Sequence, residues 1–241
     1  MSTYLYFIGD LDDKFWGRCQ WFSANYKGEI QAVVLVFNGS EIPTVLAMAH
    51  NNLGIVRELL RRIQPQLPAQ FYSHLSPGVL DELDGFSIAK HYGLHYRMML
   101  GQLPLTEEGT GIRRIGIGQM QEVLRLYHEA YPGNWFEGYM LEKGYYLGYY
   151  HAELLVAVAG THIYSPHYNI SALGNITTHP AHRGRGIARR LTATLTNRLY
   201  GQTTQIGLNV HAGNGAALKV YTQCGYATTG SFNECLVNNL L

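Results

Sequence analysis

Hydrophobic positions in the first half of the chain follow strand periodicity, with one helical stretch between the strands. Strand-like runs occupy residues 4–8, 21–26, 30–37, 44–49 and 71–75. Leu53, Val56, Leu60 and Ile63 recur at helical spacing after Asn51 and Asn52, either of which suits a helix N-cap. We predict a short helix at 77–83 and, at 86–100, a strand pair or one long bent strand.

The second half begins with a strand at 112–115 and an amphipathic helix that carries Met120, Val123, Leu124 and Tyr127. A second short helix is expected at 136–141. Strands follow at 145–150, 154–163 and 170–178, and the apolar spacing of Ile187, Leu191, Leu195 and Leu199 predicts another helix. A short strand at 208–210 and a helix after Asn214 complete the pattern.

The stretch from His179 to Leu191, HPAHRGRGIARRL, joins the strand at 170–178 to the following helix. Backbone N–H groups at a helix start have no partner within the helix and meet the positive end of its dipole, so such a turn favours an anion. Gly184 and Gly186 remove side chains where a phosphate would approach the backbone. Arginines that suit phosphate oxygens surround the glycines: Arg183, Arg185, Arg189 and Arg190. Alone, the loop is also compatible with an ordinary surface helix start.

A second motif lies thirty residues beyond Gly184. Asn214 is placed to cap a helix that carries Tyr221 and stops at Gly225. The pattern Arg183-x-x-Gly186-x-Ala188, followed by Asn214-x-x-Ala217-x-x-x-Tyr221-x-x-x-Gly225-Tyr226, resembles the GCN5-related N-acetyltransferase (GNAT) family. The resemblance extends from about Ile112 to the C-terminus and includes Pro180 ahead of the loop.

The resemblance implies an acetyltransferase that uses acetyl-CoA. The coenzyme A diphosphate would bind the amides of Gly184, Arg185, Gly186, Ile187 and Ala188, with side chains from Arg183, Arg185 and Arg189. The pantetheine arm would run beside Ile176, Thr177 and Thr178, where this strand splays from 208–210 and leaves its edge free. The Ile176 amide would then be an oxyanion-type donor. Asn214 corresponds to the residue that bonds the arm, or acts as a plain N-cap.

Tyr221 lies seven residues beyond Asn214, which is about two helical turns or ~10 Å. A phenol near pKa ~10 can donate a proton to a leaving thiolate with a pKa near ~8.5. Packing on an apolar helix face is the alternative role for this side chain. We predict that Tyr221 is catalytic, in a direct attack by an amine within a ternary complex.

The general base stays unassigned, because Asn209 stands where some members of the family carry a glutamate. Glu153, His162 and His211 are candidates, and each also suits a structural role. Aromatic residues cluster ahead of the strands: Tyr127, Tyr131, Trp135, Phe136, Tyr139 and Tyr145. We expect Tyr131, Trp135 and Tyr139 to contact the acceptor and about half of the cluster to be core. The acceptor is predicted to be a primary amine of a small molecule or peptide.

The two halves share one order of predicted elements, and GIVREL at 54–59 echoes GIARRL at 186–191. The sequence therefore predicts an α/β fold of two tandem GNAT-like units, each a mixed, mainly antiparallel twisted sheet flanked by helices. The expected domains are a degenerate copy at 1–102, a linker at 103–111 and the acetyltransferase domain at 112–241. The first copy has Asn51 and Asn52 where Arg183 and Gly184 stand, so it should not hold a diphosphate.

Hydrophobic residues make up 46% of the chain and charged residues 15%, which suits a folded core. The net charge of +1 gives no argument for nucleic acid or a membrane surface as a partner. Three cysteines without ligand spacing predict reduced thiols and no metal site. Charged residues from Asp10 onward interrupt any signal peptide, and no apolar run is long enough for a membrane span. We expect a cytoplasmic protein and leave its oligomeric state open.

Other functional classes fit the loop less well. A P-loop nucleotidase would require Lys-Ser or Lys-Thr after the glycines, and neither follows Gly186. A Rossmann unit would place the glycines in the first βα turn with an acidic residue about 20 positions later, whereas this loop comes late. The remaining alternative is a non-catalytic protein that binds an acyl-CoA or another small molecule as a sensor.

Overall fold

The computed structural model of the chain describes residues 4–49, 52–81, 83–104, 110–143 and 145–241. Asn51 and part of the predicted linker lie outside these ranges. The chain forms two compact units. Unit 1 comprises Met1–Gly9, Arg97–Val210 and Asn214–Thr229, and unit 2 comprises Asp10–Tyr96, His211–Gly213 and Gly230–Leu241.

Unit 1 is built on a mixed sheet. Its strands lie in the order β5-β10-β9-β8-β7-β6, with β6 to β9 antiparallel and β9 parallel to β10. The strands are β5 (Phe86–Leu100), β6 (Ile112–Arg114), β7 (Leu147–His151), β8 (Leu154–Ser165), β9 (Ile170–Thr178) and β10 (Gln205–His211). A parallel pair requires a crossover connection, and α6 (Ile187–Tyr200) supplies it.

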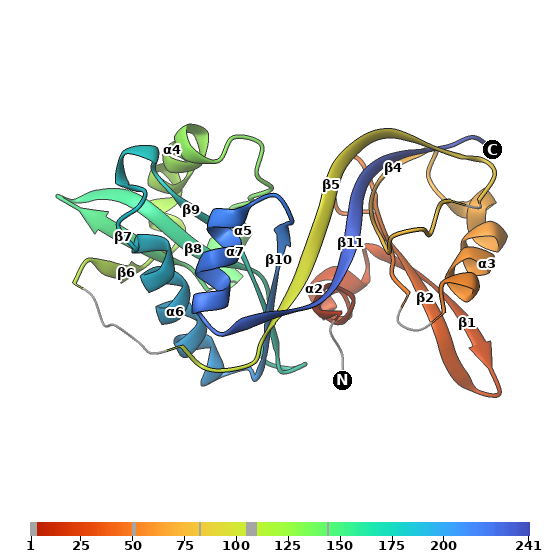
Figure 1. Cartoon of the computed structure of the whole chain (residues 1–241), viewed down its shortest axis with the longest axis horizontal. Coiled ribbons are helices and arrows are strands. Elements are labelled where there is room, and N and C mark those ends of the chain that lie inside the picture. Colours follow the sequence, from red (N-terminus) through yellow and green to blue (C-terminus); the bar gives the residue numbers. More distant parts are fainter. Residues whose placement is uncertain (1–3, 50–51, 82, 105–109, 144) are drawn as a thin grey trace. The chain divides into compact units, whose positions relative to one another are not determined.

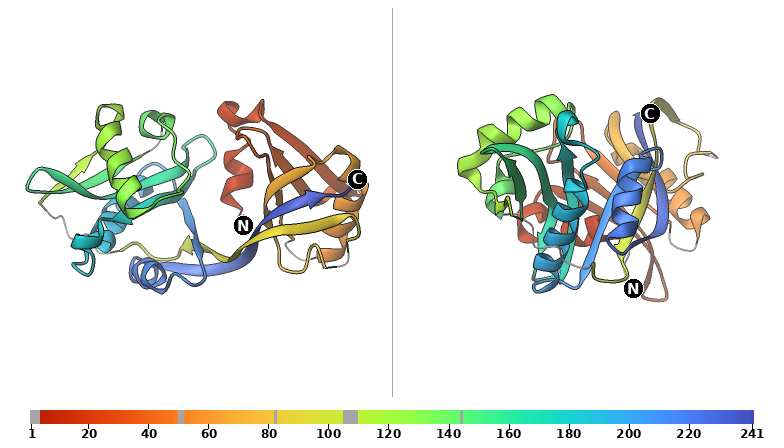
Figure 2. Two further views of the ribbon diagram at one scale, coloured as in Figure 1. Left: turned by 90° about the horizontal axis from the view of Figure 1, so that it is seen from above. Right: turned by 60° about the vertical axis from the view of Figure 1, so that its left-hand side comes forward.

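Helices cover both faces of this sheet (Figures 1 and 2). The 3₁₀ turn η2 (Ile117–Gln119), α4 (Met120–Ala130) and α5 (Tyr139–Lys143) lie on one face, where Tyr127, Met140 and Tyr146 pack against Val158. Helix α1 (Leu5–Gly9) packs through Leu5 against Ile163 and Ile170. Helix α6, which follows the 3₁₀ turn η3 (Pro180–His182), lies on the other face with α7 (Gly215–Gln223).

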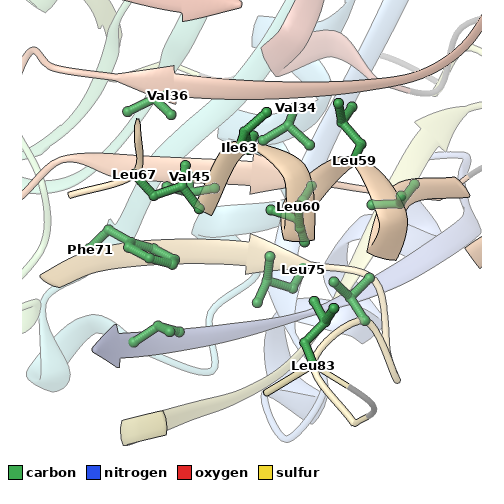
Figure 3. Close-up of a cluster of buried hydrophobic side chains, with 14 of the residues drawn as sticks. Val34, Val36, Val45, Leu59, Leu60, Ile63, Leu67, Phe71, Leu75 and Leu83 are labelled. Carbon is green, nitrogen blue, oxygen red and sulfur yellow. The ribbon is translucent and has the colours of Figure 1, made fainter. Parts of the chain in front are cut away.

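Unit 2 has a sheet in the order β1-β2-β3-β4-β11-β5. Its elements are α2 (Asp13–Trp16), β1 (Cys19–Tyr26), β2 (Glu29–Phe37), β3 (Thr44–Ala47), α3 (Leu53–Ile63), the 3₁₀ turn η1 (Gln64–Gln66), β4 (Gln70–Leu75) and β11 (Tyr226–Asn239). Figure 3 shows Leu60 and Ile63 of α3 directed at the apolar side chains of the strands, including Val45, Phe71 and Leu75. The apolar stripe of α3 is therefore buried against this sheet.

The two units repeat one succession of elements. In unit 2, three antiparallel strands, β1 to β3, are followed by α3 and by β4, which is parallel to β3. In unit 1, the antiparallel strands β7 to β9 are followed by α6 and by β10, which is parallel to β9. Each succession is followed by a long strand, β5 in the first half and β11 in the second.

The predicted mixed, mainly antiparallel sheet flanked by helices is confirmed. Two predicted elements are wrong. Residues 4–8 do not form a strand, because Leu5 and Gly9 are buried one helical turn apart in α1 and a Cβ on Gly9 would lie 2.6 Å from Ile163. Residues 77–81 and 83 form turns and irregular backbone instead of a helix, and Gly78 has a φ of +81°.

The compact units do not coincide with the predicted domains 1–102 and 112–241. Strand β5 follows first-half elements yet contributes residues 97–100 to unit 1, and β11 follows second-half elements yet contributes residues 230–239 to unit 2. The sequence pattern did not predict β11 at all. Periodicity identifies strands but does not say which sheet a terminal strand joins.

Candidate functional site

The loop between β9 and α6 is shaped by two left-handed glycines. Gly184 has a φ of +75°, and Gly186, the N-cap of α6, has a φ of +72°. Nothing lies within 4 Å of a Cβ built on either residue. The Arg190 N–H bonds the Gly186 carbonyl at 3.1 Å, so the amides of Gly186, Ile187 and Ala188 lie at the positive end of the 14-residue helix. This arrangement suits an anion.

Two of the loop arginines donate hydrogen bonds to backbone carbonyls in and around the loop. Arg183 donates from Nε to the Thr178 carbonyl at 3.0 Å and from Nη2 to the Ala130 carbonyl at 3.3 Å. Arg185 donates from Nη2 to the Ala181 carbonyl at 3.3 Å. The guanidinium of Arg190 stacks over the Tyr149 ring at 4.9 Å. Arg183 therefore ties the end of β9 to the end of α4, while its predicted contact with a diphosphate stays a prediction.

A bulge interrupts β9 at Asn175 and at Ile176, the first of the predicted arm-binding residues. Gly174 opposes Gly160 and Thr177 opposes Val158, so Asn175 and Ile176 face the single residue Ala159. Asn175 has a φ of +55°, a conformation that asparagine tolerates better than most residues. Bulges re-aim peptide groups and side chains, and this one lies at Ile176.

Asn175 is the centre of a buried hydrogen-bond network. Its Nδ2 donates to the Trp135 carbonyl at 3.0 Å and to the Tyr146 hydroxyl at 3.1 Å. The backbone carbonyl of Asn175 accepts a hydrogen bond from the Tyr127 hydroxyl at 3.0 Å. Thr177 adds a contact of 3.5 Å to the Ala130 carbonyl. These bonds connect the bulge to α4 and to the segment that carries Trp135.

Strands β9 and β10 stop pairing just before the bulge, as the family resemblance implies. Their parallel pairing runs from Ile170–Gln205 to Leu173–Leu208 and stops there. Thr177 and Thr178 still pair with β8 on the other side. The edge of residues 174–178 that faces away from β8 is thus left without a ladder partner in β10, and such an edge can pair with an extended amide ligand.

Helix α7 begins at the predicted cap. The Asn214 Oδ1 accepts from the Ala217 N–H at 3.1 Å, so the N-cap role is real, and its role toward a cofactor arm stays a prediction. Tyr221 is buried near the end of α7, with its ring 6.4 Å from that of Tyr226. Burial, with smaller contributions from Tyr131 and Cys224, raises the pKa of the Tyr221 phenol well above its usual value. It therefore stays protonated at neutral pH.

The three predicted acceptor residues have different surroundings. Tyr131 is 45% exposed at the end of α4 and lies close enough to Tyr221 to contribute to its raised pKa. Trp135 is 42% exposed, and its ring contacts that of His162 at 5.8 Å. Tyr139 packs against the α4–α5 core instead, together with Phe136. The structure thus brings Tyr131 near Tyr221 and Trp135 near the bulge.

His162 stands beside the same bulge, because a Cβ on Gly174 would lie 2.5 Å from its ring. Its Nδ1 lies 3.1 Å from the Tyr6 hydroxyl. Glu153 instead sits in the β7–β8 turn, 2.8 Å from Arg113, which lowers the pKa of its carboxyl. His211 belongs to unit 2, where its ring contacts that of His95 at 5.1 Å. Glu153 is thus engaged by Arg113, and its role as a base, like that of His162 and His211, stays a prediction.

Sequence reasoning missed Asn175. Its only local signal is an asparagine inside an apolar strand, which is compatible with a left-handed residue but does not reveal which carbonyl groups its amide binds. The network depends on the α4–α5 segment, which is distant in sequence.

Comparisons with known proteins concern the sequence of the second half and the fold of the chain. The sequence model of a family described as FR47-like protein matches residues 146–237, from β7 to β11. No curated protein matches the chain. Within the described ranges, no helix combines the length and hydrophobicity that a bilayer crossing requires.

Solved structures match over both units. A GNAT-family protein from Novosphingobium aromaticivorans is 19% identical, with a TM-score of 0.66 over 86% of this chain and 88% of that chain. A GCN5-related N-acetyltransferase from Kribbella flavida is 17% identical, with a TM-score of 0.64 over 98% and 93%. A tandem GNAT protein from the clavulanic acid biosynthesis pathway is 11% identical, with a TM-score of 0.58 over 92% and 83%. The chain therefore has a GNAT-like fold.

Proposed function

We propose that the second half of the chain is an N-acetyltransferase. It transfers an acetyl group from acetyl-CoA to a primary amine of a small molecule or peptide, by direct attack in a ternary complex. The observation that carries the proposal is the combination of the Gly184–Gly186 loop with the strand edge that opens after Leu173 and Leu208. Either feature alone is common, whereas together they provide adjacent sites for an anion and for an extended amide chain.

The residues present fit coenzyme A. The open space at Gly184 and Gly186 admits a diphosphate to the amides of residues 184–188, next to Arg183, Arg185 and Arg189. Residues 176–178 offer backbone groups to the pantetheine amides, and Asn214 lies at the start of α7. When bound, the cofactor supplies an acetyl group activated as a thioester.

The chain's own groups then perform two tasks. The Ile176 amide, which lies in the bulge, would donate a hydrogen bond to the thioester oxygen of a bound acetyl-CoA. Tyr221 would supply a proton or a hydrogen bond to the sulfur of the bound cofactor. Its raised pKa makes the phenol a weak acid but keeps the donor proton in place over the whole neutral range. Water or His162 takes the proton of the amine.

We propose further that the first half is a degenerate copy that binds no cofactor. Its β3–β4 pairing continues to Ala47–Leu75, and the Ala49 N–H bonds the Ser76 hydroxyl at 2.8 Å just beyond. In unit 1 the β9–β10 pairing stops at Leu173–Leu208, five residues before β9 ends at Thr178. Asn52 caps α3 where unit 1 has its glycine loop. The repeated order of elements and the match to a tandem GNAT protein support this interpretation.

Thiol release from acetyl-CoA in the presence of an amine panel tests the proposal, with mass spectrometry of the acetylated product. Tyr221→Phe should lower turnover by about 100-fold and leave coenzyme A affinity within about twofold. Equal turnover of this variant would refute the donor role. Tight binding without turnover of any amine would favour the sensor alternative. Calorimetry should give one coenzyme A per chain, and two would contradict the degenerate-copy proposal.

A further inference from the structure

A cluster of imidazoles adjoins the glycine loop of unit 1. His182, the last residue of η3, has its ring 5.2 Å from that of His151 at the end of β7 and 5.8 Å from that of His179. Arg185 bonds the carbonyl of Ala181, the neighbour of His182. These cationic or titratable groups lie within two residues of Gly184 in the chain or contact His182 directly.

Among the residues that the structure describes, Glu129 is the one carboxylate within salt-bridge distance of the cluster. Glu129 of α4 lies 3.1 Å from His179, which also accepts from the Ala181 N–H through Nδ1. Glu153, two residues after His151, is paired with Arg113. Partial desolvation, Arg185, His151 and His179 all lower the pKa of His182. An external anion would offset this repulsion and favour the imidazolium form of His182.

A metal ion does not explain the cluster. Across the described parts of the chain, no group of three or more His, Cys, Asp or Glu side chains could hold one. A phosphomonoester is the better match, because it carries a charge near −2 at about pH 7 and offers three acceptor oxygens to imidazolium and guanidinium donors.

We propose that His151, His182 and Arg185 bind the ribose 3′-phosphate of coenzyme A. This inference rests on the proposed function, since it assumes that the diphosphate occupies the adjacent loop. The subsite would make the protein select coenzyme A over dephospho-CoA, which lacks only this phosphate.

The preference for coenzyme A over dephospho-CoA should increase as the pH falls. A bound dianion favours the imidazolium form, so binding raises the pKa of His182 and takes up protons from solution. Glu129 lies beside His179 in the same cluster, and the arginine side chains of Arg183 and Arg185 carry a positive charge. Affinity for coenzyme A therefore rises as the pH falls from about 8 to about 6.5. Below about pH 6 the phosphate itself gains a proton and the increase ends.

Isothermal titration calorimetry of the full chain with coenzyme A and with dephospho-CoA tests this subsite. We expect coenzyme A to bind about tenfold more tightly at about pH 6.5 and only about twofold more tightly at about pH 8. Titrations in two buffers of different ionisation enthalpy should show proton uptake for coenzyme A and less for dephospho-CoA.

In the variant His151→Gln/His182→Gln, the ratio of coenzyme A affinity to dephospho-CoA affinity should fall to about one at both pH values. Its affinity for dephospho-CoA should be unchanged, and this result would also show that the loop has folded. His167→Gln is the matched control, because His167 lies in the exposed β8–β9 turn against Tyr168. Equal wild-type affinities for the two ligands, or a ratio that survives the double substitution, would overturn the subsite alone. Failure of both ligands to bind would overturn the proposed function with it.

Discussion

Replacing Asn175 with alanine should destabilise unit 1 more than the loss of one polar side chain usually does. Asn175 is 5% exposed, and its amide donates to the Trp135 carbonyl and the Tyr146 hydroxyl. Losing two buried hydrogen bonds costs about 2–3 kcal/mol. Alanine at a φ of +55° adds about 1 kcal/mol of backbone strain. The expected loss in the free energy of unfolding is therefore about 3–4 kcal/mol, or roughly 6–15 °C in Tm.

Denaturant unfolding of the full chain, followed by circular dichroism, measures this loss. Asn175→Gly is the matched variant, since it removes the same hydrogen bonds without the left-handed strain. The free energy of unfolding of Asn175→Gly should exceed that of Asn175→Ala by up to about 1 kcal/mol. The difference is no larger because glycine's greater freedom in the unfolded chain cancels part of the relief from strain. A change below about 0.5 kcal/mol in Asn175→Ala would refute the account of the bulge network.

Three further predictions concern the loop and a buried carboxyl. Arg183→Ala should raise the KM for acetyl-CoA about tenfold and change kcat less, because its guanidinium holds the loop through Thr178 and Ala130; a fall in kcat alone would contradict this role. Gly186→Ala should weaken coenzyme A binding about tenfold in calorimetry through its positive φ, whereas Gly118→Ala, at an open site without positive φ, should not. Burial raises the pKa of Asp10 to about 7. The folded state then binds the proton more tightly than the unfolded state, so stability falls as the pH rises from about 4 to about 7. Asp10→Asn should raise the free energy of unfolding at about pH 8, by as much as about 4 kcal/mol, and much less at about pH 5; an equal effect at both pH values would contradict the assignment.

Local patterns were sufficient to predict much of unit 1. The span 170–178 is β9 as predicted, and Asn214 caps α7, because strand content and capping chemistry act over a few residues. The exchange of β5 and β11 between the compact units was not predictable, since pairing partners distant in sequence leave no periodic signal. Leu5 to Gly9 illustrates the same limit, because packing against Ile163 decides between helix and strand there.

In the candidate site, too, some residues could be predicted from local sequence and others could not. The glycines, Asn214 and Tyr221 follow from motif spacing, which the chain carries in its own order. Asn175 and the contact between Trp135 and His162 come from side chains that meet only after folding. Arg183 is a third case. The motif identifies the residue, but its hydrogen bonds to Thr178 and Ala130 could not be predicted without the folded structure.

The most direct test of the central claim is a crystal structure of the full chain with coenzyme A. The account predicts the diphosphate on the amides of residues 184–188, the pantetheine arm along residues 176–178, and the sulfur near Tyr221. A nucleotide located elsewhere in the density, or crystals that take up no coenzyme A at saturating concentration, would contradict it.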